Sequence, residues 1–455
     1  MVCRVPEKLL QRSRSDFLRR HQSLRVSQVM GSVFDTLKSR GFVEQVTDEH
    51  AVRKLLSDSV TCYIGFDPTA STLHVGNLLP IMALAHMQKS GHVPIVLIGG
   101  GTGMIGDPSG KTKAREILTR EQIEKNSAAI KKQVSRYLDF GEGKAVLLNN
   151  ADWLLGLGYI EFLRDIGCHF SVNRMLTAES YKARLQTGLN FIEFNYMLLQ
   201  AYDFLYLHKN HQCLLQMGGN DQWGNIVAGL DLIRRVEGKE AYGLTFPLII
   251  TASGSKMGKT EEGAIWLDER LTSPYEYYQF WVNVDDEDVE RFMKLFTFLS
   301  QDEIEAVKGM KGKELNVAKS VLAFESTKIT HGEEKALDAW KSSASAFGYR
   351  EIDARLFPSS TIPRSSVTGD LNGMPTSSVK KEVLEKGVPA FELFSDVGRC
   401  ASRSDARRLI SQQGGYVNGE PVREYNEVIG LKHLNNGSII LRSGKKKHRR
   451  IMLSD

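Results

Sequence analysis

Short apolar runs alternate with longer amphipathic stretches over the first half of the chain. Runs with the length and continuity of buried strands lie at residues 60–64, 92–98, 144–148, 212–216 and 244–250. Stretches with helical spacing of apolar residues lie between them, at residues 78–88, 119–138, 159–167, 190–207 and 225–236. Strands and helices in this order predict a parallel sheet with right-handed crossovers. We therefore expect a Rossmann-like, doubly wound α/β domain.

The pattern changes after the last of these strands. Only helical spacing occurs at residues 275–347, which predicts an α-helical domain. Residues 358–378 are rich in Ser, Thr, Pro and Gly, which predicts an exposed, partly irregular linker. Helices at 390–397 and 404–412 and a hairpin at Asn418-Gly419 predict a small α+β domain. The expected parts are an N-terminal extension, the α/β domain, the helical domain, a linker and an end domain, at residues 1–29, 30–250, 251–350, 351–387 and 388–455.

The turn after the first predicted strand has the features of an anion site. His74-Val75-Gly76-Asn77 lies where the strand has ended and a helix begins. The start of a helix offers unpaired N–H groups and the positive end of the helix dipole. Gly76 has no side chain to keep a phosphate away, and His74 and Asn77 can donate hydrogen bonds to phosphate oxygens. The alternative is an ordinary helix start with a satisfied imidazole.

A second candidate motif is Lys256-Met-Gly-Lys259-Thr260, which lies among small residues after the last predicted strand. Two lysines three residues apart on a mobile loop can close over a triphosphate. Their charges would neutralise the negative charge that develops as pyrophosphate leaves. We call residues 74–77 the motif turn and residues 256–260 the lysine loop.

The two motifs, in this order and spacing, resemble the nucleotide signatures of class I aminoacyl-tRNA synthetases. From about Met30 to the C-terminus, the residues around and between them resemble tyrosyl-tRNA synthetases of the bacterial and organellar type. This resemblance implies ATP-dependent attachment of L-tyrosine to tRNA(Tyr) through a tyrosyl-adenylate, with release of AMP and pyrophosphate. It also implies a homodimer and Mg²⁺ that is bound with ATP, and we expect no metal held by the protein itself.

The resemblance assigns a tyrosine site. Tyr63 and Asp203 match the pair that binds the phenolic hydroxyl. The ammonium group is assigned to Asp107, Tyr196 and Gln200, with Gln216 in support. Independently, Tyr196, Gln200 and Asp203 are spaced by four and three residues, so they share one helix face. The alternative is a polar face that meets solvent, but aromatic neighbours indicate that this helix is largely buried, where unpaired polar groups are costly.

The ATP site that the resemblance implies combines both motifs with neighbouring loops. Its residues are Asp67, Thr69, His74, Gly76, Asn77, Gly219, Asp221, Gln222, Lys256 and Lys259, with Lys111 and Arg115 as weaker candidates. Neither step needs a protein nucleophile, so catalysis is expected from positioning and charge stabilisation by His74, Asn77, Lys256 and Lys259. The sequence departs from the family at Asn77, where many relatives have His. Gly258 and Thr260 depart from the class pattern, and Ile64 replaces a polar residue facing ribose.

Two other glycine-rich matches are misleading. Residues 101–106 fit the dinucleotide fingerprint Gly-x-Gly-x-x-Gly, but no acidic residue ends a strand about 20 residues later. Gly110-Lys111-Thr112 resembles the end of a phosphate-binding loop, but Ile105 occupies the position of its first glycine. A dehydrogenase and a P-loop nucleotidase are therefore disfavoured.

Composition narrows the class of protein without naming a partner. The chain of 455 residues is 42% hydrophobic and 25% charged, with a formal net charge of +5. These values are ordinary for a globular protein of several domains. Its five cysteines are scattered without zinc-ligand spacing, so we expect reduced thiols in a reducing compartment. No apolar run approaches the roughly 20 residues that span a bilayer.

Basic residues concentrate at both ends of the chain. Arg403, Arg407 and Arg408 on a predicted helix, with Lys445, Lys446 and Lys447 near the C-terminus, resemble the RNA-binding surface of an S4 domain. The alternative is a solvated charged face. Residues 1–29 contain seven Lys or Arg against Glu7 and Asp16, a composition typical of a transit peptide, so we expect the mitochondrial matrix. The alternative is a basic arm on a cytoplasmic protein.

Two rival functions remain open at this point. A tryptophanyl-tRNA synthetase shares the expected fold, but it would have no reason to pair Tyr63 with Asp203 and would usually lack the S4-like end. An RNA-binding protein derived from a synthetase, such as a splicing cofactor, would use the basic surfaces and not the pocket. The intact nucleotide motifs argue against that loss of catalysis.

Overall fold

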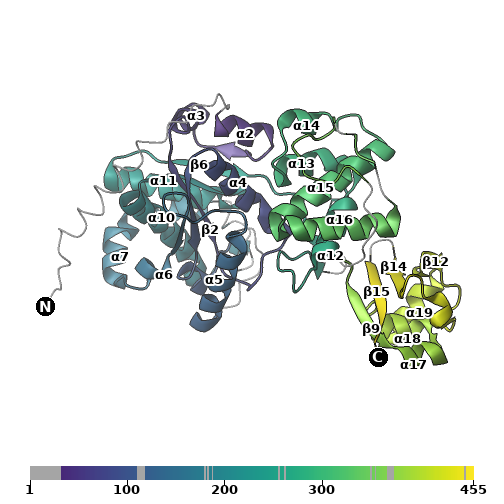
Figure 1. Cartoon of the computed structure of the whole chain (residues 1–455). Helices are drawn as coiled ribbons and strands as arrows, with labels where there is room; N and C mark the ends of the chain where they lie inside the picture. The colour runs from purple at the N-terminus through teal and green to yellow at the C-terminus, as the bar shows by residue number, and fades with distance from the viewer. Residues whose placement is uncertain are drawn as a thin grey trace.

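The computed structural model describes residues 32–109, 118–178, 181, 184–186, 188–254, 257–260, 263–348, 351–353, 355–365, 373–444 and 447–454, without the side chains of Lys259 and Thr260. Figure 1 shows three successive parts along the chain: an α/β part, a helical part and a small end part. Within the described residues, no helix is both long and apolar enough to cross a membrane.

A six-stranded sheet with the order β1-β6-β5-β2-β3-β4 forms the centre of the α/β part. The strands are β1 (Gln45–Val46), β2 (Thr61–Phe66), β3 (Val93–Ile98), β4 (Val146–Asn149), β5 (Cys213–Gly219) and β6 (Tyr242–Phe246). The strands β2 to β6 pair in parallel, whereas β1 is antiparallel to β6. The doubly wound fold is confirmed, but the sheet is mixed. Strand β1 lies at the edge of the sheet, beside β6.

Helices cover both faces of this sheet (Figure 1). They are α2 (Val33–Ser39), α3 (Glu49–Leu55), α4 (Leu78–Lys89), α5 (Arg120–Val134), α6 (Ala151–Leu154), α7 (Tyr159–Asp165), α8 (Val172–Leu176), α10 (Phe191–His211) and α11 (Trp223–Glu237). Short 3₁₀ turns lie at Val75–Asn77, Thr102–Met104, Gly167–His169 and Asn220–Gln222. Side chains of β2 alternate between two cores, as the two-residue period of a strand requires. Cys62 and Ile64 pack with α4, whereas Tyr63 packs with Phe204 of α10.

The helical part shares a core with one face of the sheet. It contains α12 (Pro274–Val282), α13 (Val289–Phe296), α14 (Gln301–Glu305), α15 (Lys313–His331) and α16 (Glu333–Phe347), with a 3₁₀ turn at Asp286–Asp288. Trp281 and Phe324 belong to the same buried cluster as Met82 of α4. The lysine loop lies between the two parts, and its strand β7 (Lys259–Thr260) pairs with β8 (Gly263–Ala264).

The end part has its own core and a five-stranded sheet with the order β12-β11-β14-β15-β9. Its elements are β9 (Thr376–Lys380), α17 (Lys381–Lys386), β10 (Val388–Pro389), α18 (Ala390–Asp396), α19 (Arg403–Ser411), β11 (Gly415–Val417), β12 (Glu420–Pro421), β13 (Val428–Ile429), a 3₁₀ turn (Leu431–His433), β14 (Ser438–Ser443) and β15 (Lys447–Ser454).

The structure differs from the predicted linker at residues 351–387. Strand β9 pairs in parallel with β15, and Leu384 of α17 lies in the end core. Ile362 and Met374, both within the stretch expected to be exposed, are buried. Composition misled here because β9 is a polar edge strand, Thr-Ser-Ser-Val-Lys, whose side chains are exposed or half-buried, so its residues look like those of a linker.

Candidate active site

Polar residues gather where the parallel strands end. Asp67 follows β2, Thr102 lies in the turn after β3, Asn150 follows β4, and Gln222 lies in the turn after β5. Since the carboxyl ends of parallel strands meet at one edge of the sheet, these residues converge there. This edge is where open α/β sheets bind ligands.

Tyr63 and Asp203 lie on the same side of the sheet, deeply buried. The Tyr63 side chain is 1% exposed, and its hydroxyl has no hydrogen-bond partner among the described residues. Its ring packs against Phe204 with ring centres 5.3 Å apart. Asp203 is 2% exposed, and burial together with the Asp203 charge raises the pKa of Tyr63. The structure therefore places both members of the predicted hydroxyl-binding pair in one buried region.

Two residues that the sequence analysis missed hold the Asp203 carboxylate. Asn150 Nδ2 donates to Oδ2 at 2.8 Å, and Trp153 Nε1 donates to Oδ1 at 2.7 Å. Burial raises the pKa of Asp203 to about 7, and these two hydrogen bonds act in the opposite direction. The nearby charge of Asp67 raises the pKa further. The signal for Asn150 and Trp153 was their place directly after a predicted strand, at the edge where ligand-binding residues collect.

A continuous hydrogen-bond network joins residues that were predicted for different substrates. Tyr196, predicted for the ammonium group, donates its hydroxyl to Asp67 Oδ2 at 3.0 Å, although Asp67 was predicted for ATP. The Thr102 hydroxyl donates to Asp67 Oδ1 at 3.2 Å and accepts from Asn150 Nδ2 at 3.0 Å. The network therefore links Asp67 through Thr102 and Asn150 to Asp203.

Asp107 is the centre of a second network. It is 5% exposed, and Gln222 Nε2 donates to its Oδ2 at 2.8 Å. Asn225, which the sequence analysis missed, donates to Gln222 Oε1 at 3.1 Å and to Gln200 Oε1 at 3.1 Å. Burial, then the charge of Asp67, raises the pKa of Asp107 to about 6. The buried Asp107 and Asp203, together with the half-buried Asp67, thus form an acidic region that a cation would stabilise.

The remaining predicted residues on this side lie around these networks. Gln216 of β5 is 3% exposed, and its Oε1 has no hydrogen-bond partner among the described residues. Asp221 is exposed and accepts from Gln222 Nε2 at 3.3 Å. The Asp221 side chain lies close to the backbone of Gly219, and a Cβ added to Gly219 would lie 2.5 Å from Asp221 Oδ1. Thr69 is exposed and its N–H donates to the Asp67 carbonyl at 2.8 Å.

The motif turn contradicts one expectation, because its backbone N–H groups are already paired. The N–H of Val75 donates to the Ile265 carbonyl at 2.9 Å, and that of Asn77 donates to the His74 carbonyl at 2.8 Å. The N–H of Gly76 donates to His74 Nδ1 at 3.0 Å. The turn is a closed capping box, in which Asn77 Oδ1 accepts from the His74 N–H. Any anion contact here must therefore come from side chains, with Nε2 of His74 and Nδ2 of Asn77 as the donors.

The structure gives Gly76 a packing role in addition to the phosphate contact expected of it. A Cβ at this position would lie 3.0 Å from the Met257 carbonyl and 2.7 Å from Cε1 of His74. A Cβ at Gly258, whose φ is +81°, would lie 2.8 Å from the Gly76 nitrogen. The two glycines therefore allow the lysine loop to pack directly on the motif turn. The Trp266 ring also lies beside the His74 ring, with ring centres 6.1 Å apart.

Several predicted residues lie outside the described part of the chain. These are Lys111, Arg115, Lys256, Lys445 and Lys446, and Lys259 is described by its backbone alone. The Lys259 backbone lies in β7 and pairs with Ala264. No group of three or more His, Cys, Asp or Glu side chains that could hold a metal ion occurs among the described residues.

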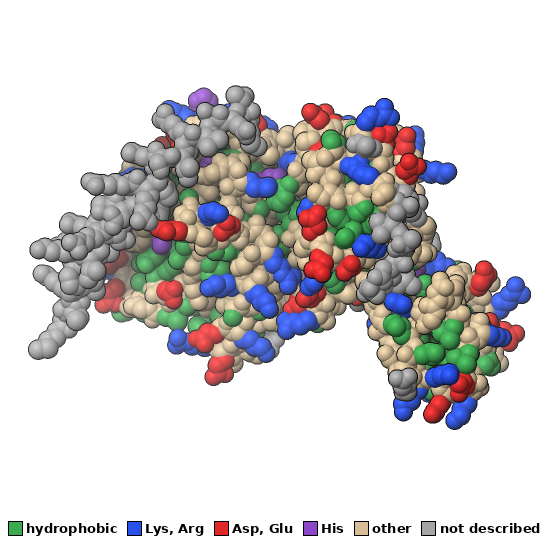
Figure 2. Space-filling view, viewed as in Figure 1, with side chains coloured by type: hydrophobic (Ala, Val, Ile, Leu, Met, Phe, Trp, Pro, Cys, Tyr) green, Lys and Arg blue, Asp and Glu red, His purple; other side chains and the backbone are tan. Residues whose placement is uncertain are grey.

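The arginines of helix α19 in the end part contact neighbouring side chains, and two of them are paired with carboxylates. Arg403 pairs with Glu392 at 3.2 Å, and Arg408 pairs with Asp405 at 3.0 Å. The Arg407 guanidinium lies over the Phe391 ring, 4.1 Å from its centre. Lys447 begins β15. Figure 2 shows basic and acidic side chains interspersed over this part of the surface.

The doubly wound sheet, the acidic site at its carboxyl edge and the lysine loop against the motif turn define a class I tRNA synthetase. A family model for tRNA synthetases class I (W and Y) matches residues 56–348. The tyrosine–tRNA ligase of Syntrophus aciditrophicus is 61% identical over 421 residues, which is 92% of this chain and 98% of the relative. That of Desulfatibacillum aliphaticivorans is 57% identical over 93% of this chain and 99% of the relative.

A solved structure agrees with these relatives. The C-terminally truncated mitochondrial tyrosyl-tRNA synthetase of Aspergillus nidulans is 30% identical, with a TM-score of 0.63 over 74% of this chain and 100% of that chain. The chain therefore belongs to the tyrosyl-tRNA synthetases of the bacterial type. The predicted resemblance is confirmed, and it excludes the dehydrogenase and P-loop alternatives.

Proposed function

We propose that this chain is a tyrosine–tRNA ligase that joins L-tyrosine to tRNA(Tyr) in two steps. The tyrosine carboxylate attacks the α-phosphorus of ATP, which forms tyrosyl-adenylate and releases pyrophosphate. A hydroxyl of the terminal tRNA ribose then attacks the adenylate carbonyl and releases AMP. One observation carries the proposal within this family: the Tyr63 hydroxyl, unpaired among the described residues, lies in the same buried region as the Asp203 carboxylate.

This pair favours a phenol over a phenyl ring for a physical reason. A tyrosine hydroxyl could donate to the Asp203 carboxylate and accept from the Tyr63 hydroxyl. Phenylalanine would leave these buried groups without that partner, and an unsatisfied buried polar group costs about 1–3 kcal/mol. Asn150 and Trp153 keep the carboxylate in place, so little rearrangement is needed when the substrate binds.

The acidic region beside the pair suits the tyrosine ammonium group. Asp107, Gln200 and Tyr196 are the residues we assign to it, with Asp67 bound directly to Tyr196. Burial, followed by the charge of Asp67, raises the pKa of Asp107. An ammonium ion placed between them would relieve this repulsion, which gives the region a reason to bind an amino acid rather than a neutral ligand.

On the nucleotide side, we assign the triphosphate to the motif turn and the lysine loop. The side chains of His74 and Asn77 would donate hydrogen bonds, and Lys256 and Lys259 would neutralise the departing pyrophosphate together with the Mg²⁺ that accompanies ATP. Gly219, Asp221 and Gln222 lie at the end of β5, where they could contact the ribose. Thr69 and Asp67 complete the assignment at the end of β2.

We propose that a second copy of this chain binds to an exposed apolar surface on α6, α7, α8 and the start of α10. Its large side chains are Leu155, Tyr159, Ile160, Val172, Phe191 and Ile192, of which Ile160 is 69% and Phe191 67% exposed. Side chains of this size are seldom left in water together, and such a patch is typical of a protein–protein contact. Analytical ultracentrifugation of Phe191→Asp tests the homodimer, and an unchanged sedimentation coefficient would contradict this interface.

We assign tRNA binding to the end part and to the helical part, and a mitochondrial destination to residues 1–29. The support for the first is the basic set Arg403, Arg407, Arg408 and Lys445–Lys447, and for the second the basic, acid-poor composition. Nitrocellulose-filter binding of tRNA to the chain without residues 376–455 tests the first. Import of the full chain into isolated mitochondria tests the second.

The experiment that tests the central proposal is exchange of labelled pyrophosphate into ATP with tyrosine, phenylalanine or tryptophan. Tyrosine-dependent exchange is expected, with far slower exchange for the other two amino acids. Tryptophan-dependent exchange would instead indicate a tryptophanyl-tRNA synthetase. The absence of exchange together with intact tRNA binding would indicate an RNA-binding protein.

A further inference from the structure

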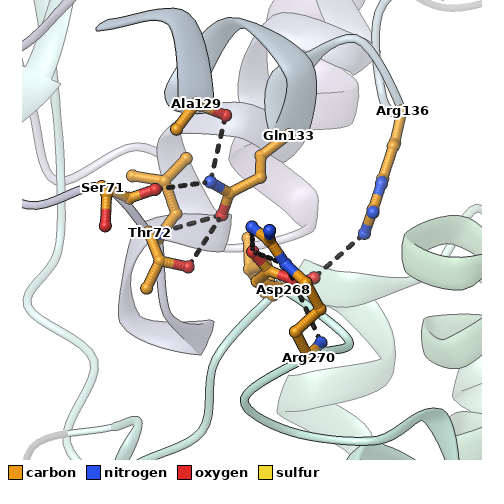
Figure 3. Close-up of polar contacts among 9 residues, drawn as sticks. Ser71, Thr72, Ala129, Gln133, Arg136, Asp268 and Arg270 are labelled. Carbon is orange, nitrogen blue, oxygen red and sulfur yellow. Dashed lines mark hydrogen bonds and ion pairs between the residues drawn. The ribbon is translucent and has the colours of Figure 1, made fainter. Parts of the chain in front are cut away.

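Gln133, near the end of α5, forms hydrogen bonds with the residues directly before the motif turn. Its side chain is buried, at 4% exposure. Its Oε1 accepts from the Leu73 N–H at 2.9 Å and from the Thr72 hydroxyl at 3.4 Å. Its Nε2 donates to the carbonyls of Ser71 at 3.2 Å and Ala129 at 3.1 Å. Figure 3 shows the Gln133 carboxamide reaching from α5 to Ser71 and Thr72.

These contacts are made to the residues directly before His74. The backbone of residues 71–73 belongs to no helix or strand, so its polar groups lack the partners that regular structure provides. Buried backbone groups of this kind need a partner from elsewhere in the protein. Gln133 provides one for the Leu73 N–H and one for the Ser71 carbonyl, so the position of this segment follows the position of α5.

Arg136, three residues further on, supports the segment that returns from the lysine loop. Its Nη1 donates to the Leu267 carbonyl at 3.0 Å and to the Thr330 carbonyl of α15 at 3.4 Å. In Figure 3 its side chain points toward the segment of Asp268. Asp268 is itself paired with Arg270 at 2.6 Å. Gln133 in α5 and Arg136, two residues beyond its end, thus each bind a backbone segment beside the nucleotide side of the site.

The two supported segments pair with each other. The Leu267 N–H donates to the Leu73 carbonyl at 2.8 Å, and the Val75 N–H donates to the Ile265 carbonyl at 2.9 Å. The Ile265 N–H in turn donates to the Gly258 carbonyl at 3.2 Å, inside the lysine loop. A chain of hydrogen bonds therefore runs from Gln133 through the motif turn to the loop that carries the lysines.

We infer that Gln133, assisted by Arg136, is a positioning residue for adenylate formation, because it sets where His74 stands relative to the lysine loop. The inference depends on the proposed function of the site. Gln133 touches no substrate in this account. The tyrosine pocket, in contrast, is built on β2, α10 and the residues after β4, and α5 provides none of the polar contacts described for it.

Gln133→Met tests the inference, since methionine has a similar length and keeps the apolar volume but makes none of the four hydrogen bonds. The kcat of tyrosine-dependent pyrophosphate exchange should fall roughly 10- to 100-fold, because small displacements of catalytic groups reduce rates on that scale. The KM for tyrosine should stay within about twofold. If Gln133 had a purely structural role, the substitution would lower the melting temperature of the protein without reducing kcat at an unchanged KM.

Gln279→Met is the matched control. Gln279 of α12 is the same residue type with the same 4% exposure, and its Nε2 donates to Ser343 Oγ at 3.1 Å, within the helical part. Both variants lose buried hydrogen bonds, so both should melt at a lower temperature. Only Gln133→Met should lose exchange activity at 25 °C, where circular dichroism shows each variant folded.

The outcomes separate the inference from the proposed function. No tyrosine-dependent exchange by the unaltered chain would refute the proposed function itself. Exchange by the unaltered chain with equal kcat for Gln133→Met and Gln279→Met would overturn the inference, and so would a loss explained by a raised KM for tyrosine. If Gln133→Met does not fold, the test uses Arg136→Met instead, because Arg136 is exposed. A kcat for Arg136→Met equal to that of the unaltered chain would then overturn the inference.

Discussion

The two halves of the site are built in different ways. The tyrosine pocket of Tyr63, Asn150, Trp153 and Asp203 lies on a strand, a long helix and residues that follow a strand. Asn150 and Trp153 bind the Asp203 carboxylate directly. The nucleotide side is a turn and a loop, held by hydrogen bonds from Gln133 of α5, from Arg136 just after α5 and from residues 265–267. The Asp203 carboxylate is thus held by residues close to the central sheet, whereas the nucleotide side depends on how two segments distant in sequence pack together.

This difference has a consequence for catalysis. Specificity needs fixed groups, because a pocket that rearranged could adapt to phenylalanine. Phosphoryl chemistry needs charges that close over ATP and open again for pyrophosphate, and loops are suited to such movement. Substitutions in the pocket should thus change which amino acid is used, and substitutions on the nucleotide side should change how fast adenylate forms.

The largest effect is expected for Lys259→Ala. We propose that Lys259 stabilises the departing pyrophosphate, so its loss should lower the kcat of exchange by roughly 10²–10³-fold. Binding of tRNA, measured by nitrocellulose-filter retention, should remain within about twofold of the unaltered chain. An equal loss of exchange and tRNA binding would contradict the role of Lys259 and would indicate general misfolding.

Asp203→Asn should have the next largest effect, and on selectivity rather than rate alone. A hydrogen bond to a charged group is worth about 1.5–3 kcal/mol, so the ratio of kcat/KM for tyrosine to that for phenylalanine should fall roughly 10- to 150-fold. Asp107→Asn is the comparison, since it should weaken the use of both amino acids alike. If the two variants changed the ratio equally, Asp203 would have no special relation to the hydroxyl.

Gly258→Ala should separate loop packing from loop flexibility. An added Cβ would lie 2.8 Å from the Gly76 nitrogen, so the loop could not pack on the motif turn as it does here. We expect about a tenfold loss in kcat of exchange, on the scale of 1–2 kcal/mol of strain and displacement. Gly254→Ala is the matched control, because its φ of +83° is similar but its Cβ would meet no atom within 4 Å. Similar kinetics for the two variants would contradict the packing role.

The smallest effect is expected from pH. The pKa of Asp107 is raised to about 6 and that of Asp203 to about 7, so both take up protons as the pH falls from 8 to 5. A protonated Asp107 no longer neutralises an ammonium group, so tyrosine affinity should fall with decreasing pH, by at most about tenfold per unit for each proton. Equilibrium dialysis at fixed ionic strength measures this. In Asp107→Asn the dependence near pH 6 should disappear.

Much of the fold could be predicted from the pattern of apolar residues. The five parallel strands and the helices predicted between them lie within a few residues of their predicted positions, and residues 275–347 contain only helices, as expected. Strand β9 was missed because its polar sequence resembles a linker, and β1 was missed because two residues give no periodic signal. Both are edge strands, whose side chains contribute little to the core.

The candidate site was predicted in part. The one-face spacing of Tyr196, Gln200 and Asp203 did place all three toward the interior side of α10. The expectation of free N–H groups at the motif turn was wrong. Ile265 lies 190 residues from Val75 in sequence, and nothing in the local pattern indicates that the two residues pair. Gln133 was not anticipated for the same reason, whereas Asn150 and Trp153 had only the weaker signal of lying after a predicted strand.

Local sequence by itself determined where helices and strands form and which residues face the interior, because periodicity and capping act over a few neighbouring positions. Only the tertiary structure decided which polar groups meet, such as Gln133 with Leu73 or Trp153 with Asp203. The physical reason is that a hydrogen bond requires its two atoms to lie within about 3 Å. That distance depends on how whole elements pack, and it cannot be read from the neighbours of either residue.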